Sequence, residues 1–155
     1  MKICADENIS RRLVGIVNDL SIGSPILLHV SEIGSLGVKD SIWVRSFAER
    51  NGDAIVTGDA NMSRRQSELI AIGETGLKLV ILPTQYQQGG IRLQAAYMLL
   101  WWPRVVELVQ HGEKGCFLQL PALTLPRVPT WERIDVQAAR QRLRKSTRPS
   151  RQIKP

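Results

Sequence analysis

Short apolar runs rich in β-branched residues alternate along this chain with longer segments whose apolar residues recur at helical spacing. The clearest run is 53–57 (DAIVT), which Gly58 ends. Similar runs lie at 2–5, 26–30, 77–82 and 116–120. Because helical segments separate the runs, we expect parallel pairing between strands joined by crossover helices. The alternation predicts an α/β fold with a mainly parallel sheet of four to five strands flanked by helices.

Four longer segments have the spacing of amphipathic helices. They lie at 9–20, 40–48, 61–72 and 91–110. Pro103 falls inside the last of these, and proline removes a backbone donor, so we expect a kink or a break there. Residues 85–90 are polar and predict a loop, and the prolines at 126 and 129 limit 123–129 to an edge strand.

Acidic side chains follow two of the predicted strands directly. Asp6 comes after the first run, and Asp59 comes just past the run that ends at Thr57. In open α/β sheets the crevice outside the carboxyl ends of the strands is where ligands bind, so we expect both side chains at one edge. Two adjacent carboxylates repel each other unless one is protonated or a cation lies between them. Mg²⁺ prefers such oxygen ligands, and the spacing suggests a metal site.

Asp40 is a third acidic candidate, because it follows the second predicted strand on the same side of the sheet. Asp and Asn after strands are also good turn and cap residues, and Asp40 alone would be read as the N-cap of the next helix. Asp6, Asp40, Asp59 and Asn61 all fall on one predicted edge, which favours a functional cluster over four separate caps.

The net charge of +7 is confined to the end of the chain. Residues 1–132 contain 13 Lys and Arg and 13 Asp and Glu, whereas residues 133–155 contain eight Lys and Arg and one acid. We therefore expect one domain over 1–130 and a basic, flexible tail over 131–155 with a short helix at 136–145. A basic tail on a neutral body suits nucleic acid, and it also suits an acidic protein partner.

No run approaches the 18 apolar residues or more of a membrane-spanning helix, and the amino-terminal residues lack a signal-peptide pattern. Cys4 and Cys116 both lie in apolar runs, and we expect two buried thiols in a reducing compartment. The chain is therefore expected to be cytoplasmic, without contact to a membrane.

Three short motifs, in order, resemble the PIN-like nuclease superfamily, and specifically the group related to VapC-type toxins. They are 3–8 (ICADEN), 37–40 (GVKD) and 56–62 (VTGDANM). The resemblance covers about residues 2–129. It implies a metal-dependent ribonuclease that acts on RNA, often as the toxin half of a toxin-antitoxin pair with a cognate antitoxin protein as partner.

On that pattern Asp6, Asp40 and Asp59 would hold Mg²⁺ or Mn²⁺, and Thr57 would help to position the site. The fourth acidic position of the group falls on Asn61, where this sequence departs from it. Asn can still offer an oxygen or hold a water, but it carries no charge, so a second metal would bind more weakly.

Two other interpretations compete with the nuclease. One is a PIN-like RNA- or protein-binding module that has lost its chemistry. The other is a receiver-like phosphoacceptor, which normally needs a lysine near the site, whereas Lys78 begins its strand and would point to the wrong end. Whether the protein forms a homodimer is open.

Basic residues that could contact the RNA backbone lie in two places. Arg64 and Arg65 fall in the first turns of the predicted helix at 61–72, where a solvated face is an equally good interpretation. The others belong to the tail: Arg140, Arg142 and Arg144.

Overall fold

All five strands of the sheet run parallel, in the order β2-β1-β3-β4-β5. The strands are β1 (Ile3–Ala5), β2 (Leu27–His29), β3 (Ala54–Thr57), β4 (Lys78–Ile81) and β5 (Phe117–Gln119). The predicted α/β fold with a mainly parallel sheet is confirmed, and the sheet has five strands. These features belong to residues 1–122, which the computed structural model describes.

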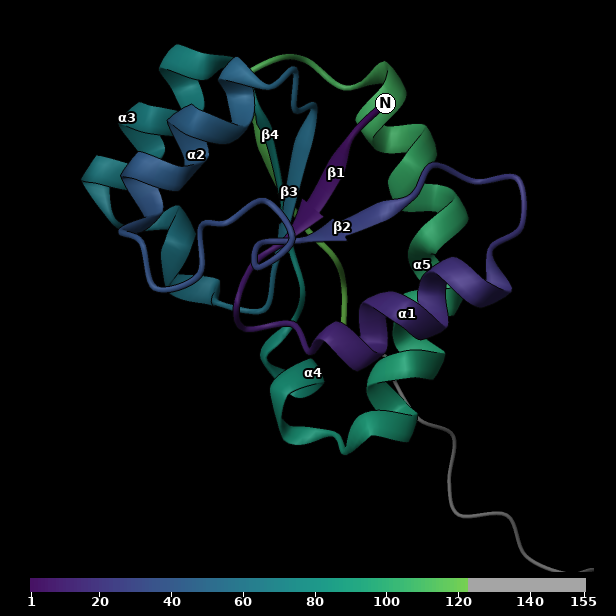
Figure 1. Cartoon of the computed structure of the whole chain (residues 1–155). Helices are drawn as coiled ribbons and strands as arrows, with labels where there is room; N and C mark the ends of the chain where they lie inside the picture. The colour runs from purple at the N-terminus through teal and green to yellow at the C-terminus, as the bar shows by residue number, and fades with distance from the viewer. Residues whose placement is uncertain (123–155) are drawn as a thin grey trace, which may run out of the picture. The chain divides into compact units, whose positions relative to one another are not determined.

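Helices fill the connections between the strands, as the alternating pattern predicted. They are α1 (Arg11–Leu20), α2 (Asp40–Glu49), α3 (Gln66–Thr75), α4 (Thr84–Gln88) and α5 (Ile91–His111), with a short 3-10 helix at Ala60–Ser63. Figure 1 shows α1 and α5 on one face of the sheet and α2 and α3 on the other. Within residues 1–122, no helix has the length and apolar character needed to cross a membrane.

Each face of the sheet has its own hydrophobic core, because successive strand residues point to opposite faces. Ile3, Ala5 and Val56 pack with α1 and α5. Cys4 and Ile55 are direct neighbours of these residues in β1 and β3, so they point to the opposite face and pack with α2 and α3. Both layers are needed to cover a parallel sheet, whose strands are apolar on both sides.

The register between β1 and β3 sets the position of the polar edge. Ile3 pairs with Ala54 and Ala5 pairs with Val56. The backbone N–H of Asp6 then donates to the carbonyl of Val56 at 3.0 Å. Asp6 therefore leaves β1 level with Thr57, the last residue of β3.

The structure differs from the sequence predictions at four local points. Residues 84–88 form the short helix α4 instead of a loop, and α5 is not broken at Pro103, so of the two expected alternatives only the kink stays a prediction. Trp102 and Val105 beside this proline are buried, and such packing outweighs the lost backbone hydrogen bond. The third helix begins at Gln66, after the 3-10 turn, and not at 61–63. Cys116 is exposed, because it precedes β5 at the border of the described sheet, while Cys4 is buried.

Several predictions concern residues outside the described part of the chain. These are the domain boundary at 130/131, the edge strand at 123–129, the helix at 136–145 and the tail arginines Arg140, Arg142 and Arg144. They stay predictions.

The turn into β3 provides a test of the packing between α2 and the sheet. A Cβ added at Gly52 would lie 2.5 Å from two atoms of the Phe47 ring, which is buried and cannot withdraw. We expect Gly52→Ala to lower the free energy of unfolding by about 1–3 kcal/mol. Gly15→Ala is the matched control, because its Cβ would meet no atom within 4 Å on helix α1. It should raise stability by about 0.5–1 kcal/mol. Urea unfolding followed by circular dichroism measures both changes, and equal effects of the two substitutions would contradict this account.

Candidate active site

One buried hydroxyl joins the ends of β1 and β3. The Thr57 hydroxyl donates to Oδ2 of Asp6 and accepts the backbone N–H of Asp59 at 2.9 Å. Thr57 is fully buried and Asp6 is 4% exposed. Asp6 and Asp59 therefore lie at the same edge of the sheet, the carboxyl edge, as their positions after neighbouring parallel strands require.

Asp6 is a buried carboxylate held by local hydrogen bonds. Its Oδ1 accepts the backbone N–H of Asn8 and its Oδ2 accepts the Asn8 side-chain amide, each at 3.0 Å. Burial raises the pKa of Asp6 above its ordinary value, and the negative charge of Asp40 adds to the rise. The hydrogen bonds from Asn8 and Thr57 lower this pKa and so limit the increase. Asp40 is therefore close enough for its charge to disfavour ionisation of Asp6.

Asp40 is the first residue of α2, and its side chain does not cap that helix. The N-cap position is Lys39, without a side-chain cap hydrogen bond, so the competing interpretation of Asp40 as the N-cap is wrong. Oδ1 of Asp40 instead accepts the indole N–H of Trp43 at 3.0 Å. Its negative charge in the first turn still interacts favourably with the helix dipole.

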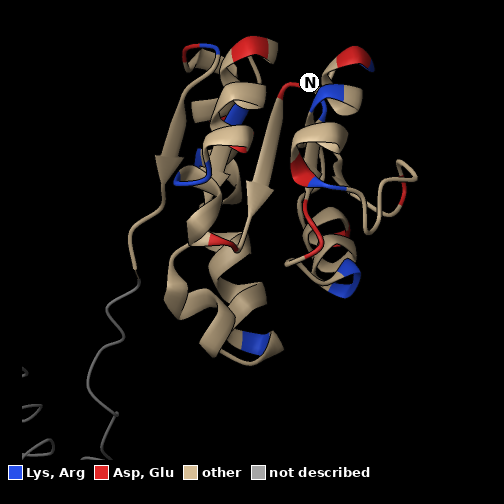
Figure 2. Cartoon of the chain, turned by 90° about the vertical axis from the view of Figure 1, so that its left-hand side faces the viewer, with Lys and Arg blue, Asp and Glu red and all other residues tan. Residues whose placement is uncertain are grey.

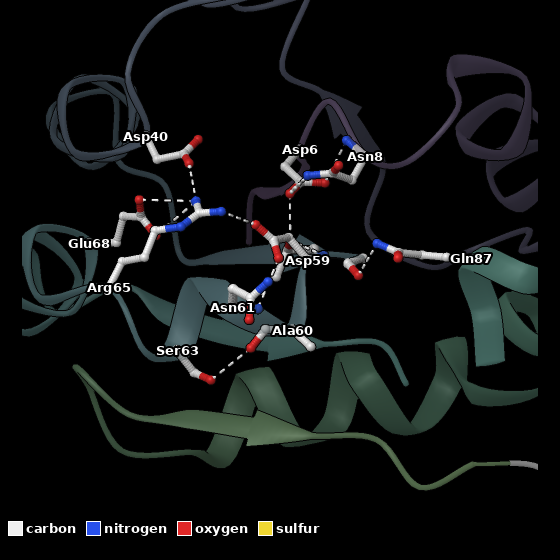
Figure 3. A network of polar contacts seen from close by, with 12 residues as sticks. Asp6, Asn8, Asp40, Asp59, Ala60, Asn61, Ser63, Arg65, Glu68 and Gln87 are labelled. Carbon is white, nitrogen blue, oxygen red and sulfur yellow. Dashed lines mark hydrogen bonds and ion pairs between the residues drawn. The ribbon is translucent and has the colours of Figure 1, made fainter. Parts of the chain in front are cut away.

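The Arg65 guanidinium lies among three carboxylates from three different elements (Figure 3). Its Nη2 is 2.7 Å from Oδ2 of Asp59, and its Nη1 is 3.2 Å from Oδ2 of Asp40. The same Nη1 is 3.2 Å from Oε1 of Glu68, three residues further along the chain. Arg65 thus connects the end of β3, the start of α2 and the first turn of α3.

Glu68 is the most buried of these three carboxylates, with a side chain 7% exposed. Burial raises the pKa of Glu68, and the Arg65 guanidinium counteracts part of that rise. The negative charges of Asp40 and Asp59 raise it further. In return, the carboxylates raise the pKa of Arg65, so the guanidinium remains charged.

The donor set at this edge fits a hard divalent cation in its chemistry, since carboxylate oxygens are the ligands that Mg²⁺ and Mn²⁺ prefer. Within residues 1–122, however, no group of three His, Cys, Asp or Glu side chains is arranged to hold a metal ion. The carboxylates surround Arg65 instead. The assignment of Asp6, Asp40 and Asp59 as metal ligands therefore stays a prediction.

Two further predicted residues are placed at the exit from β3. The backbone N–H of Asn61 donates to Oδ1 of Asp59 at 2.9 Å, and Asn61 itself is exposed. Arg64 is also exposed. As RNA contacts, Arg64 and Arg65 both stay predictions, and in this structure the Arg65 guanidinium is bound to carboxylates. Figure 2 shows acidic and basic residues interspersed over the helices and loops of the described part.

Three residues near the site did not figure among the candidates from sequence. Glu68 had one available signal, its spacing of three residues from Arg65 on a predicted helix. Asn8 lies within the motif at 3–8, and its side-chain amide donates to Asp6, while Ser10 caps α1. Gln87 lay in a predicted loop, and its side-chain amide donates to the carbonyl of Gly58 at 2.6 Å (Figure 3). No sequence pattern indicated that contact.

Comparison with known proteins gives one family. A family model described as a PIN like domain matches residues 1–84, which include every one of the carboxylates discussed above. No curated protein and no solved structure matches the chain.

Removing the Thr57 hydroxyl tests the connection between the two strand ends. Thr57→Val keeps the shape of the side chain, but it leaves Oδ2 of Asp6 and the Asp59 N–H without this partner. We expect a loss of about 1–3 kcal/mol in unfolding free energy and a further rise in the pKa of Asp6. Thr57→Ser keeps the hydroxyl and is the control, so the pKa of Asp6 should change little. Carboxyl NMR titration measures it, and an unchanged pKa in Thr57→Val would contradict the contact.

The raised pKa of Asp6 predicts the direction of a pH dependence. When the pH rises above the ordinary value of 3.8, the unfolded chain loses the Asp6 proton before the folded protein does. The stability of the wild type relative to Asp6→Asn should therefore fall as the pH rises from 3.8, and level off above the folded-state pKa. Urea unfolding of both proteins in EDTA measures this difference. A difference that increases with pH would mean that the folded state lowers the pKa of Asp6.

Proposed function

This chain belongs to the PIN-like domain family, and on that premise we propose that it is a metal-dependent ribonuclease that hydrolyses phosphodiester bonds. Membership supports a nuclease-type fold. The observation that carries the proposal is that Thr57, through the carboxylate of Asp6 and the backbone N–H of Asp59, holds these two acidic residues at the carboxyl edge of the parallel sheet. Ligands of open α/β sheets bind at this edge.

In this proposal the side chains of Asp6, Asp40 and Asp59 hold Mg²⁺ or Mn²⁺. When bound, such a cation lowers the pKa of a water and stabilises the charge that develops on the phosphate. Thr57 orients Asp6 through its hydroxyl and fixes the turn that carries Asp59. Asn61 hydrogen-bonds a water at the exposed side of the site, without adding negative charge.

RNA is the substrate class in this proposal, and its backbone needs cationic contacts. Arg64 is exposed beside the site and is proposed to contact a phosphate. The tail arginines are assigned the same role from the sequence alone. Binding through such contacts weakens steeply as the salt concentration rises.

The proposal extends to a biological role as the toxin of a toxin-antitoxin pair in the cytoplasm, with a cognate antitoxin protein as the partner. Support for this comes from the three motifs that resemble the group related to VapC-type toxins. A homodimer is a further proposed assembly.

The alternative function is a catalytically impaired PIN-like module that binds RNA or protein. Two observations favour it. Asn61 stands where the related group has an acidic residue, and Arg65 neutralises part of the remaining negative charge. A binder of this kind would keep its RNA affinity in EDTA.

A cleavage assay with and without metal separates the two functions. We expect the purified full chain to cleave labelled single-stranded RNA with MnCl₂ or MgCl₂, and to lose this activity in EDTA. Asp59→Asn should lower the rate by more than about a hundredfold, because loss even of a residue that only orients a metal ligand costs about 10–100-fold.

Asp19→Asn is the matched control for this assay. Asp19 is an exposed carboxylate near the end of α1 and takes part in none of the ion pairs among the described residues. Its substitution should leave the rate unchanged. RNA binding without cleavage in any metal, with equal affinity in EDTA, would reject the ribonuclease in favour of the binding module.

A further inference from the structure

Arg65 occupies the position of a cation among the carboxylates to which we assign metal binding. Arg65 contacts two of them, Asp40 and Asp59, and one oxygen of each of these two is already bound by the scaffold. Oδ1 of Asp59 accepts the Asn61 backbone N–H, and Oδ1 of Asp40 accepts the Trp43 indole N–H. The remaining oxygen of each, Oδ2, is the one that Arg65 binds. A metal ion that takes these two residues as ligands must therefore compete with the guanidinium.

The charges around Arg65 favour its replacement by a divalent ion. Asp40, Asp59 and Glu68 together carry three formal negative charges, and Arg65 supplies one positive charge. The excess negative charge leaves an attraction for a divalent ion that the guanidinium does not satisfy.

Arg65 and its partner Glu68 differ in how freely their side chains can move. The Arg65 side chain is 46% exposed, so rotation into solvent meets little obstruction. Glu68 is 7% exposed, and a buried carboxylate without a cation is strongly destabilising. Departure of Arg65 is therefore favourable only when another cation takes its place.

We propose that Arg65 is an exchangeable internal cation, which holds the carboxylates together in the metal-free protein and moves to an RNA phosphate when a divalent ion takes them. The phosphate half of this inference rests on the proposed ribonuclease function. A guanidinium suits both positions, because its planar fork binds carboxylate and phosphate in the same bidentate manner. Metal and RNA binding then support each other, since each favours the displaced position of Arg65.

Mn²⁺ affinity without RNA tests the displacement directly. We expect Arg65→Gln to bind Mn²⁺ about tenfold more tightly than the wild type, because no guanidinium has to be displaced. The control is Arg45→Gln, which removes an arginine of nearly equal exposure, 45%, from an ion pair with Glu74 between α2 and α3. Its Mn²⁺ affinity should equal that of the wild type. Electron paramagnetic resonance of free Mn²⁺ measures all three proteins.

A second measurement uses a 2′-O-methyl oligoribonucleotide, which offers phosphates but resists hydrolysis. This probe should raise the Mn²⁺ affinity of the wild type and of Arg45→Gln, and should have much less effect on Arg65→Gln. Arg65→Lys is a further variant that keeps the charge, and circular dichroism confirms that each variant is folded. An ammonium group cannot bind several carboxylates at once with the planar geometry of a guanidinium. The Mn²⁺ affinity of Arg65→Lys should therefore lie between those of the wild type and Arg65→Gln.

The outcomes distinguish this inference from the proposed function. Equal Mn²⁺ affinity in the wild type and Arg65→Gln overturns the inference, whether or not the protein cleaves RNA. If Arg65→Gln gains Mn²⁺ affinity but the wild type cleaves no RNA, the displacement is supported and the ribonuclease function is rejected. An oligoribonucleotide effect that is the same in all variants overturns the phosphate half.

Discussion

The hydrogen bond between the Thr57 hydroxyl and the Asp6 carboxylate is the interaction on which the rest of the site depends. A carboxylate that is 4% exposed needs donors to offset the loss of water, and Asp6 obtains them from Thr57 and Asn8. The same hydroxyl accepts the Asp59 N–H, so the two strand ends cannot shift independently. The pairing of Ala5 with Val56 is what places these groups side by side. The register between β1 and β3 therefore determines the geometry of the site.

A second constraint is the balance of charge at this edge. Carboxylates gathered at the ends of parallel strands repel each other, and the fold must offset that repulsion before any ligand arrives. Arg65 does so from the start of α3, where it contacts carboxylates from α2, from the end of β3 and from its own helix (Figure 3). The guanidinium is therefore a structural element as well as a candidate participant in function.

The fold could be predicted from sequence because it depends on local patterns: apolar runs, helical periodicity and the breaks between them. The placement of Asp6 and Asp59 followed from the same patterns, since residues after parallel strands share one edge. Glu68 and the contacts of Arg65 could not be predicted in this way. They depend on where α3 begins, at Gln66 after a 3-10 turn, and on side-chain directions that periodicity does not encode. The exposure of Cys116 was missed for a related reason, because an apolar run does not reveal which strand lies at an edge.

Asn61 and Arg65 act on the charge of the site in the same direction. An acidic residue at 61 would add a negative charge next to Asp59, whose Oδ1 already accepts the Asn61 N–H. The asparagine avoids that charge, and the arginine offsets part of what remains. Each residue reduces the repulsion among the carboxylates in the absence of a ligand, and each lowers the attraction for a divalent ion. A site balanced in this way is stable when empty, and in the function proposed here it would draw part of its metal affinity from the phosphate that displaces Arg65.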